Sequence, residues 1–266
     1  MRRFGAGLAA LVLLLGLLPL TLSSCYITCG CASTPDPNWT PPPVSAAEAV
    51  AAAAKFAAGS TGTQPSGLDA ALVYSGQDHP LYAVQEPTVG AVVDAHGGLV
   101  LEYVQIDAIP DSNDVTISSA EAEARATSFL SDCGWVTGIL VATTTLRSGA
   151  TSVYEVTWAA QSGGAGQISV SVNPSSGTPF AFVDERSGVQ LVPPSIGATA
   201  AGRLALAAVS TPGEIVLSTD FRFDLAHPYW DINLATPSAT ATAAPEHGAS
   251  VSVDAVTGAV TVGKSY

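Results

Sequence analysis

The sequence predicts an α+β fold of three tandem small units, each a helix packed on an antiparallel β-sheet. The first observation is a hairpin pattern: alternating valines, then an Asp or Asn, then a Gly four residues later. Period-two alternation places the valines on one face of a sheet, and the Asp and Gly supply the turn. The pattern recurs at spacings of 79 and 81 residues, which indicates tandem copies of one unit. Its copies are Asp94 with Gly98, Asn173 with Gly177, and Asp254 with Gly258.

The second observation is a helix signal at the start of each unit. Ser45 with Glu48, and Ser118 with Glu121, form capping boxes that satisfy the free backbone N–H groups of a helix start. We expect these Ala-rich helices to end near residues 58 and 132. A third helix is expected near residues 198 to 209, although it lacks the acidic partner and contains Gly202. Eleven residues after Ser45, Ser118 and Ser195 stand Phe56, Phe129 and Leu206, so these three are expected on a constant helix face.

The third observation is an aromatic residue on the second predicted strand of each unit: Tyr82, Tyr154 and Trp230. Segments 106–117 and 185–195 carry prolines and are the predicted boundaries between units. The units are therefore expected to cover residues 45–105, 118–185 and 195–266. Units this small have little core each, so we expect them either to pack on one another or to be marginally stable individually.

The N-terminus predicts export and a lipid anchor. Residues 1–24 combine a basic start with a short apolar stretch, as in a signal peptide. The ending Leu22-Ser23-Ser24-Cys25 resembles a bacterial lipobox, which implies that Cys25 is lipidated, for example with palmitate, and becomes the first mature residue. Residues 25–44 then include five prolines, a composition that favours an extended tether. This resemblance implies a lipid-anchored protein on the extracytoplasmic face of a bacterial cell membrane.

The charge of the chain excludes one class of partner. The formal net charge is −13, and the chain after residue 24 has only seven Lys and Arg residues. Nucleic-acid binding needs clustered basic side chains, so no nucleic-acid partner is expected. An anionic lipid surface would also repel the chain, so contact with the membrane is expected through the lipid anchor.

The repeated pattern of a helix, an aromatic strand and a closing valine hairpin resembles the PepSY family. The likeness is strongest at Tyr154-Glu155-Val156 and in the last hairpin, and it is weaker in the second hairpin, where Asn173-Pro174 replaces Asp-Ala. The resemblance implies a module found in propeptides of secreted metallopeptidases, associated with inhibition and folding assistance, and in envelope proteins without a peptidase. Because this chain has no His-Glu-x-x-His motif, only action on a separate partner remains.

No catalytic, cofactor or metal site is expected. The histidines His79, His96, His227 and His247 have no metal-type spacing. His96-Gly97-Gly98 lies in a repeated hairpin turn, and no Gly-x-Ser-x-Gly elbow accompanies it. The acidic residues Asp107, Asp111 and Asp114 lack the spacing of an EF-hand and are interpreted as a solvated linker. For Cys29, Cys31 and Cys133, further acylation, a disulfide and free thiols stay open, with a half-buried structural thiol favoured for Cys133.

These observations predict a non-enzymatic surface lipoprotein that acts as a protein-interaction module. The leading hypothesis is regulation or inhibition of a secreted or envelope peptidase, through addition of a partner segment to an exposed sheet edge. Tyr82, Tyr154 and Trp230 are the candidate markers of the strand involved, with core packing as their alternative role. The alternative function is a small-ligand or cell-wall binding lipoprotein, which a clustered apolar pocket between units would favour.

Overall fold

The computed structural model describes residues 43–74, 80–135, 140–160, 167–185, 193–209, 212–222, 228–236 and 248–265. The predicted signal peptide, Cys25, Cys29 and Cys31 lie outside these residues, as do His79, His227 and His247.

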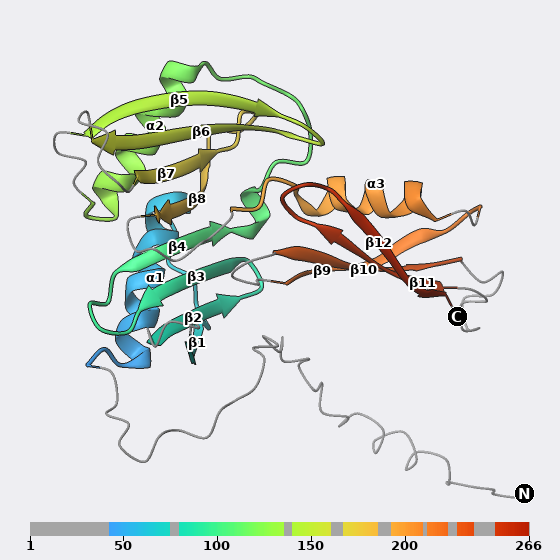
Figure 1. Cartoon of the computed structure of the whole chain (residues 1–266), viewed down its shortest axis with the longest axis horizontal. Helices are drawn as coiled ribbons and strands as arrows, with labels where there is room; N and C mark the ends of the chain where they lie inside the picture. Colours follow the sequence, from blue (N-terminus) through green and yellow to red (C-terminus); the bar gives the residue numbers. More distant parts are fainter. Residues whose placement is uncertain are drawn as a thin grey trace, which may run out of the picture.

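In the described residues, each of three α-helices is followed along the chain by four β-strands (Figure 1). The first group is α1 (Ala46–Thr61), β1 (Asp69–Tyr74), β2 (Pro80–Glu86), β3 (Val89–Asp94) and β4 (Val100–Gln105), with the short 3₁₀ helix η1 (Ile106–Ala108) after it. The second is α2 (Ser119–Asp132), β5 (Leu140–Ser148), β6 (Ser152–Ala160), β7 (Gln167–Val172) and β8 (Pro179–Asp184). The third is α3 (Ala198–Ala208), β9 (Ile215–Arg222), β10 (Tyr229–Ala235), β11 (Gly248–Asp254) and β12 (Val260–Ser265).

The first two groups share one sheet. Its eight strands follow the order β1-β2-β3-β4-β8-β7-β6-β5, and the third group forms a separate sheet in the order β12-β11-β10-β9. The junction is an antiparallel pairing of β4 with β8, in which Tyr103 faces Phe182. Each group therefore runs as a simple antiparallel meander. The first two meanders join through their last strands, β4 and β8, which lie side by side.

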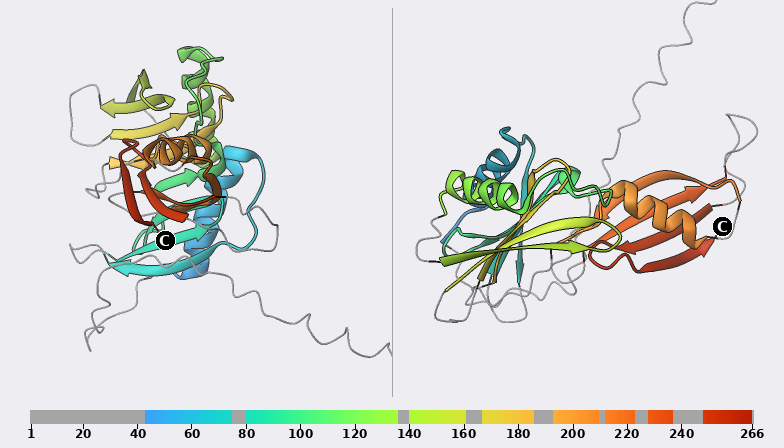
Figure 2. Two further views of the ribbon diagram at one scale, coloured as in Figure 1. Left: turned by 90° about the vertical axis from the view of Figure 1, so that its right-hand side faces the viewer. Right: turned by 90° about the horizontal axis from the view of Figure 1, so that it is seen from above.

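Two hydrophobic cores hold these layers together. Helices α1 and α2 lie on the same face of the eight-stranded sheet (Figure 2), and the first core fills the space beneath them. Phe56 of α1 contacts Phe129 of α2 and Phe182 of β8, with ring centroids 5.8 and 5.0 Å apart. The second core lies between α3 and the four-stranded sheet and also includes Val92 and Val183 of the larger sheet.

The predicted hairpins are confirmed in all three groups. Strands β3 and β4, β7 and β8, and β11 and β12 pair antiparallel across the predicted turns. In each turn the Asp or Asn carbonyl accepts the N–H of the Gly four residues later, at 2.7 to 2.9 Å. These glycines have φ between 68° and 76°, a conformation that a residue with a Cβ rarely adopts. They are Gly98, Gly177 and Gly258.

The two capping boxes are also confirmed, at Ser45 and at Ser118. Helix α1 ends later than predicted, because the left-handed residue that stops it is Gly62. Helix α3 lies where it was expected, but its N-cap is Gly197 and not Ser195. Leu206 is therefore not equivalent to Phe56 and Phe129, and the prediction that it shares their helix face is wrong. Leu206 is accordingly only half-buried, while Ala205 is buried.

Candidate interaction surface

The three aromatic side chains that the sequence singles out are buried, and their polar tips make equivalent hydrogen bonds. The Tyr82 hydroxyl donates to the Val44 carbonyl at 2.9 Å, and the Tyr154 hydroxyl donates to the Ile117 carbonyl at 3.2 Å. In the third group the Trp230 indole N–H donates to the Ile196 carbonyl at 2.7 Å. Each acceptor is the residue directly before a helix N-cap, so each aromatic residue fixes the entry of its helix.

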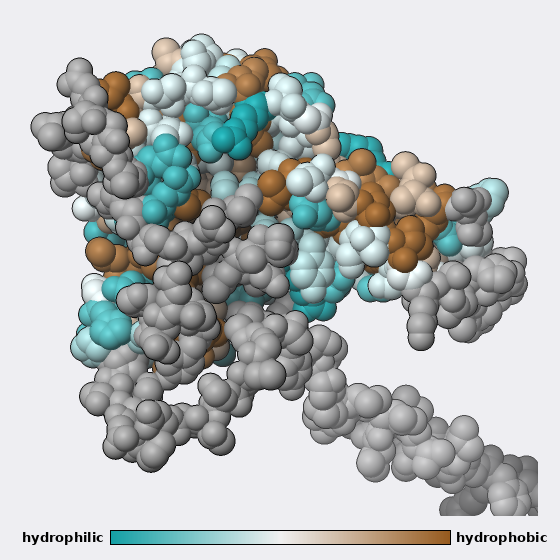
Figure 3. Space-filling view, in the orientation of Figure 1, coloured by the Kyte–Doolittle hydropathy of each residue, from teal (hydrophilic) through white to brown (hydrophobic). Residues whose placement is uncertain are grey.

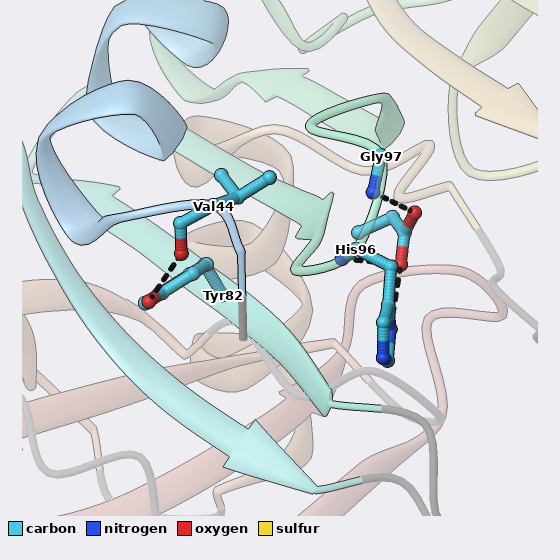
Figure 4. Close-up of polar contacts among 5 residues, drawn as sticks. Val44, Tyr82, His96 and Gly97 are labelled. Atoms are coloured by element: carbon cyan, nitrogen blue, oxygen red, sulfur yellow. Dashed lines mark hydrogen bonds and ion pairs between the residues drawn. The ribbon is translucent and has the colours of Figure 1, made fainter. Parts of the chain in front are cut away.

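The hairpin turns accept hydrogen bonds from the same three residues, each of which directly precedes a helix N-cap. The N–H groups of Val44, Ile117 and Ile196 donate to carbonyls in the first, second and third turns, at 2.9 to 3.2 Å. In the first turn, the Asp94 carboxylate accepts the N–H groups of His96 and Gly97, beside the bond from Tyr82 to Val44 (Figure 4). The exposed His96 side chain lies 3.9 Å from Asp94 and belongs to this turn. The aromatic residues thus tie helix, strand and turn together in each group.

The strands that carry these aromatic residues are paired on both sides. Strand β2 lies between β1 and β3, β6 between β5 and β7, and β10 between β9 and β11. Because a partner segment adds only to a free strand edge, Tyr82, Tyr154 and Trp230 do not mark a strand that can accept one. The strands at the ends of the two described sheets are β1, β5, β9 and β12.

Among these four, β5 is the longest and the least protected. It has nine residues, no proline, and one charged side chain, Arg147, which forms an ion pair with Glu155 on β6. Natural proteins usually blunt an edge with charges, prolines, bulges or short strands. By contrast, β1 has six residues, β9 carries Asp220 and Arg222, and the pairing of β12 with β11 contains an irregularity.

Apolar side chains stand on both faces of β5. Val141 is 49 % exposed and Leu146 is 42 % exposed, and the residues between them include three consecutive threonines. Residues 141 and 146 have opposite parity, so they project on opposite sides of the sheet. The surface of this part of the molecule is mainly pale and teal with scattered brown atoms, whereas brown atoms gather over the four-stranded sheet (Figure 3). The sequence did not reveal β5 as the edge, because edge position depends on how the two meanders join.

The structure shows the surroundings of one buried thiol and the placement of the His, Asp and Glu side chains in the described residues. Within the described residues, no group of three or more His, Cys, Asp and Glu side chains is placed to hold a metal ion. Cys133 is a buried free thiol at the end of α2, and burial raises the pKa of this thiol to about 12. A thiol with so high a pKa is protonated at neutral pH and is a poor nucleophile.

No helix in the described part of the chain is long and apolar enough to span a lipid bilayer.

No protein family model and no curated protein sequence matches the chain. Among solved structures, the chain is similar to the Bacillus megaterium YpeB C-terminal domain, at 17% sequence identity and a TM-score of 0.41. The similarity covers 83% of this chain and 98% of that one. At this identity and TM-score, the likeness says nothing about what the chain binds.

Proposed function

We propose that the chain is a non-enzymatic protein-interaction module of three PepSY-like units, and that it binds an extended segment of a partner along β5. The observation that carries this proposal is the nine-residue edge strand, whose outer side pairs with no described strand. The repetition of one arrangement of helix, aromatic anchor and hairpin turn supports the tandem units.

Strand addition fits the chemistry of β5. The backbone N–H and C=O groups on its outer side supply hydrogen bonds to any extended segment, and the side chains beside them set the preference for particular residues. Val141 and Leu146 offer apolar contacts on the two faces, and the threonines between them favour the extended conformation. A partner segment with apolar residues spaced to meet both faces suits this edge.

The partner that we propose is a secreted or envelope peptidase, which the module regulates or inhibits in trans. This part of the proposal rests on the family resemblance of the repeated motif and on the lack of a peptidase motif in the chain. We further propose that lipidated Cys25 holds the protein at the extracytoplasmic face of a bacterial membrane, with residues 25–44 as the tether.

The test compares two double variants in a capture experiment. Val141→Lys with Leu146→Lys places charges along β5, while Ile215→Lys with Leu217→Lys makes the same change on β9, where both side chains are exposed. Full-length protein on beads is incubated with envelope and secreted fractions of the source bacterium, and bound proteins are quantified by mass spectrometry. We expect a peptidase to bind the wild-type protein and the β9 variant, and the β5 variant to lose about tenfold or more of that binding.

The peptidase is then assayed with each variant added. Inhibition by the wild type and the β9 variant, and not by the β5 variant, supports regulation through β5. Equal capture by both variants places the binding site elsewhere, and enrichment of no protein by the wild type overturns the interaction hypothesis.

A further inference from the structure

The last strands of the three groups are not paired alike. In the first two groups the last strands, β4 and β8, pair with each other and complete one eight-stranded sheet. Strand β12 is the last strand of the third group, which projects to one side of that sheet (Figure 1), and its outer side pairs with no described strand. Because the groups repeat one arrangement of helix and meander, β12 is the equivalent of β4 and β8 without their partner.

The hairpin turns show which residues of these strands are equivalent. The residue three positions before the turn Asp or Asn pairs with Tyr103 in the first group and with Phe182 in the second. In the third group the residue at the same position pairs with Val262. Val262 therefore has the place on β12 that Tyr103 has on β4 and Phe182 has on β8.

The junction of β4 with β8 brings two equivalent residues together. Tyr103 lies directly opposite Phe182, in the middle of the antiparallel pairing of the two strands. The junction thus has the local arrangement of two copies related by a twofold axis, in which the same surface is used on both sides. Two copies of β12 can pair by the same arrangement, because antiparallel pairing of identical strands is also twofold symmetric.

The exposure of these equivalent positions differs between the groups. Tyr103 and Phe182 are buried in the core beneath α1 and α2, whereas Val262 is 46 % exposed. Val262 pairs with Val251, which is buried in the core beneath α3, and directly opposite residues of paired strands project on the same face. Strand β12 thus exposes an apolar side chain at the position where the first two groups bury theirs against each other.

The outer edge of β12 suits strand pairing. The register shift against β11 lies between Ala249 and Val251, so residues 260–262 keep a regular register. Register shifts also occur in the hairpins of β4 and β8, and they do not prevent the junction of these two strands. The sequence of β12 contains neither a proline nor an acidic residue. The last point matters because the chain has a net charge of −13, so two copies repel each other at long range.

The helices contribute less to such a pairing than they do in the internal junction. Eleven residues after the helix N-caps stand Phe56 in α1, Phe129 in α2 and Ala208 in α3. Phe56 and Phe129 contact each other, whereas Ala208 is small and exposed. Pairing through β12 therefore buries less apolar surface, and we expect a reversible association.

We propose that β12 pairs with β12 of a second copy of this chain, in an antiparallel register that places Val262 opposite Val262. The two third groups then form one eight-stranded sheet with both α3 helices on the same face, as α1 and α2 lie on the first sheet. The unpaired backbone groups of both edges gain hydrogen-bond partners, and the two Val262 side chains bury each other. This interface is separate from β5, which stays free in each copy.

Sedimentation equilibrium under reducing conditions tests the association. The sample is residues 25–266, the chain after the predicted signal peptide, which contains every described residue. We expect a reversible dimer. Val262→Lys places two like charges opposite each other, so it should raise the Kd of the dimer by about tenfold or more. Leu217→Lys is the matched control, because it adds the same charge at an exposed apolar position on β9, the other edge of this sheet.

Disulfide cross-linking tests the register. Directly opposite residues of antiparallel strands have Cα atoms about 4.5–5.5 Å apart, a separation that a disulfide spans. Val262→Cys, in a chain in which Cys25, Cys29 and Cys31 are replaced by Ser, should therefore form a covalent dimer on mild oxidation. Leu217→Cys in the same background should not. Circular dichroism verifies that each variant is folded like the wild type.

Dimerisation that is weakened in Val262→Lys and kept in Leu217→Lys, with covalent dimers of Val262→Cys alone, supports β12 as the interface. A wild-type chain that stays monomeric up to about 0.1 mM overturns the proposal, since a dimer with a Kd of about 10 μM is mostly associated there. Equal association of the two Lys variants places the contact elsewhere and also overturns it. Failure of Val262→Cys to cross-link, or equally fast cross-linking of Leu217→Cys, overturns it as well.

Discussion

Glu102, on the central strand β4, is only 1 % exposed, and its Oε2 atom has no hydrogen-bond partner. Its backbone pairs with Val92 on one side and Val183 on the other, both members of the hydrophobic core. Burial raises the pKa of this carboxyl well above its ordinary value of 4.5. The folded protein therefore holds the Glu102 proton more tightly than the unfolded chain does, and the group favours the folded state only while it is protonated.

The raised pKa of Glu102 predicts that the free energy of unfolding depends on pH. As pH rises above 4.5, the unfolded chain loses the Glu102 proton first, so the free energy of unfolding falls with rising pH. The slope is at most about 1.4 kcal/mol per pH unit for one proton. Glu102→Gln, which cannot ionise, should remove this slope, so its stability relative to the wild type should be higher at pH 8 than at pH 5. Urea unfolding of both proteins at pH 5 and pH 8 measures this difference in stability.

Asp69→Asn, at an exposed position on β1, is the matched control and should keep the wild-type pH dependence. A constant difference between Glu102→Gln and the wild type across this pH range would contradict the argument.

At the scale of elements, helix α3 receives its cap from a distant segment. Gly197, its N-cap, has no side chain to donate or accept. Asp111 takes this role from the segment between the first two groups, since its Oδ1 atom accepts the N–H of Ala200 at 3.0 Å. The Pro110 carbonyl also accepts the Gly197 N–H at 2.8 Å, and the Asp111 carbonyl accepts from Arg203. A Cβ at Gly197 would lie 2.5 Å from Asp111 Oδ1, so the close approach requires glycine.

Replacing this cap should loosen one helix selectively. Asp111→Ala leaves the N–H of Ala200 in the first turn of α3 without its acceptor, and the loss of a typical N-cap costs about 1 kcal/mol. Hydrogen exchange followed residue by residue should show faster exchange at Ala200, with the amides of α1 unchanged. Asp114→Ala is the control in the same segment, because within the described residues the Asp114 carboxylate accepts a hydrogen bond from the Ser112 hydroxyl and none from α3. Exchange at Ala200 that is as slow as in the wild type would refute the role of Asp111.

At the scale of the whole molecule, the sequence predicted the features that depend on residues close together in the chain, namely hairpin turns and helix caps. The turns at Asp94, Asn173 and Asp254 and the caps at Ser45 and Ser118 depend on residues within a few positions, so the sequence revealed them. The helix α3 was also expected near residue 198, but its cap comes from Asp111, 89 residues before Ala200, and no local pattern indicates this cap. The edge positions of β5 and β12 likewise depend on which strands become neighbours. Composition and periodicity do not specify that arrangement.

The pairing of β4 with β8 also decides which part of the chain can fold alone. Without β8, the β4 edge would be open, and Phe56 would lose its contacts with Phe129 and Phe182. A segment of this size has little core of its own to offset that loss. Residues 43–108 should therefore show no cooperative unfolding transition, or should self-associate through the open edge, whereas residues 43–185 should unfold cooperatively. Urea denaturation followed by circular dichroism, with sedimentation to detect association, compares the two segments. A cooperative unfolding transition of monomeric residues 43–108 would show that the first unit is an independent domain. Its stability would then not depend on the sheet that it shares with the second group.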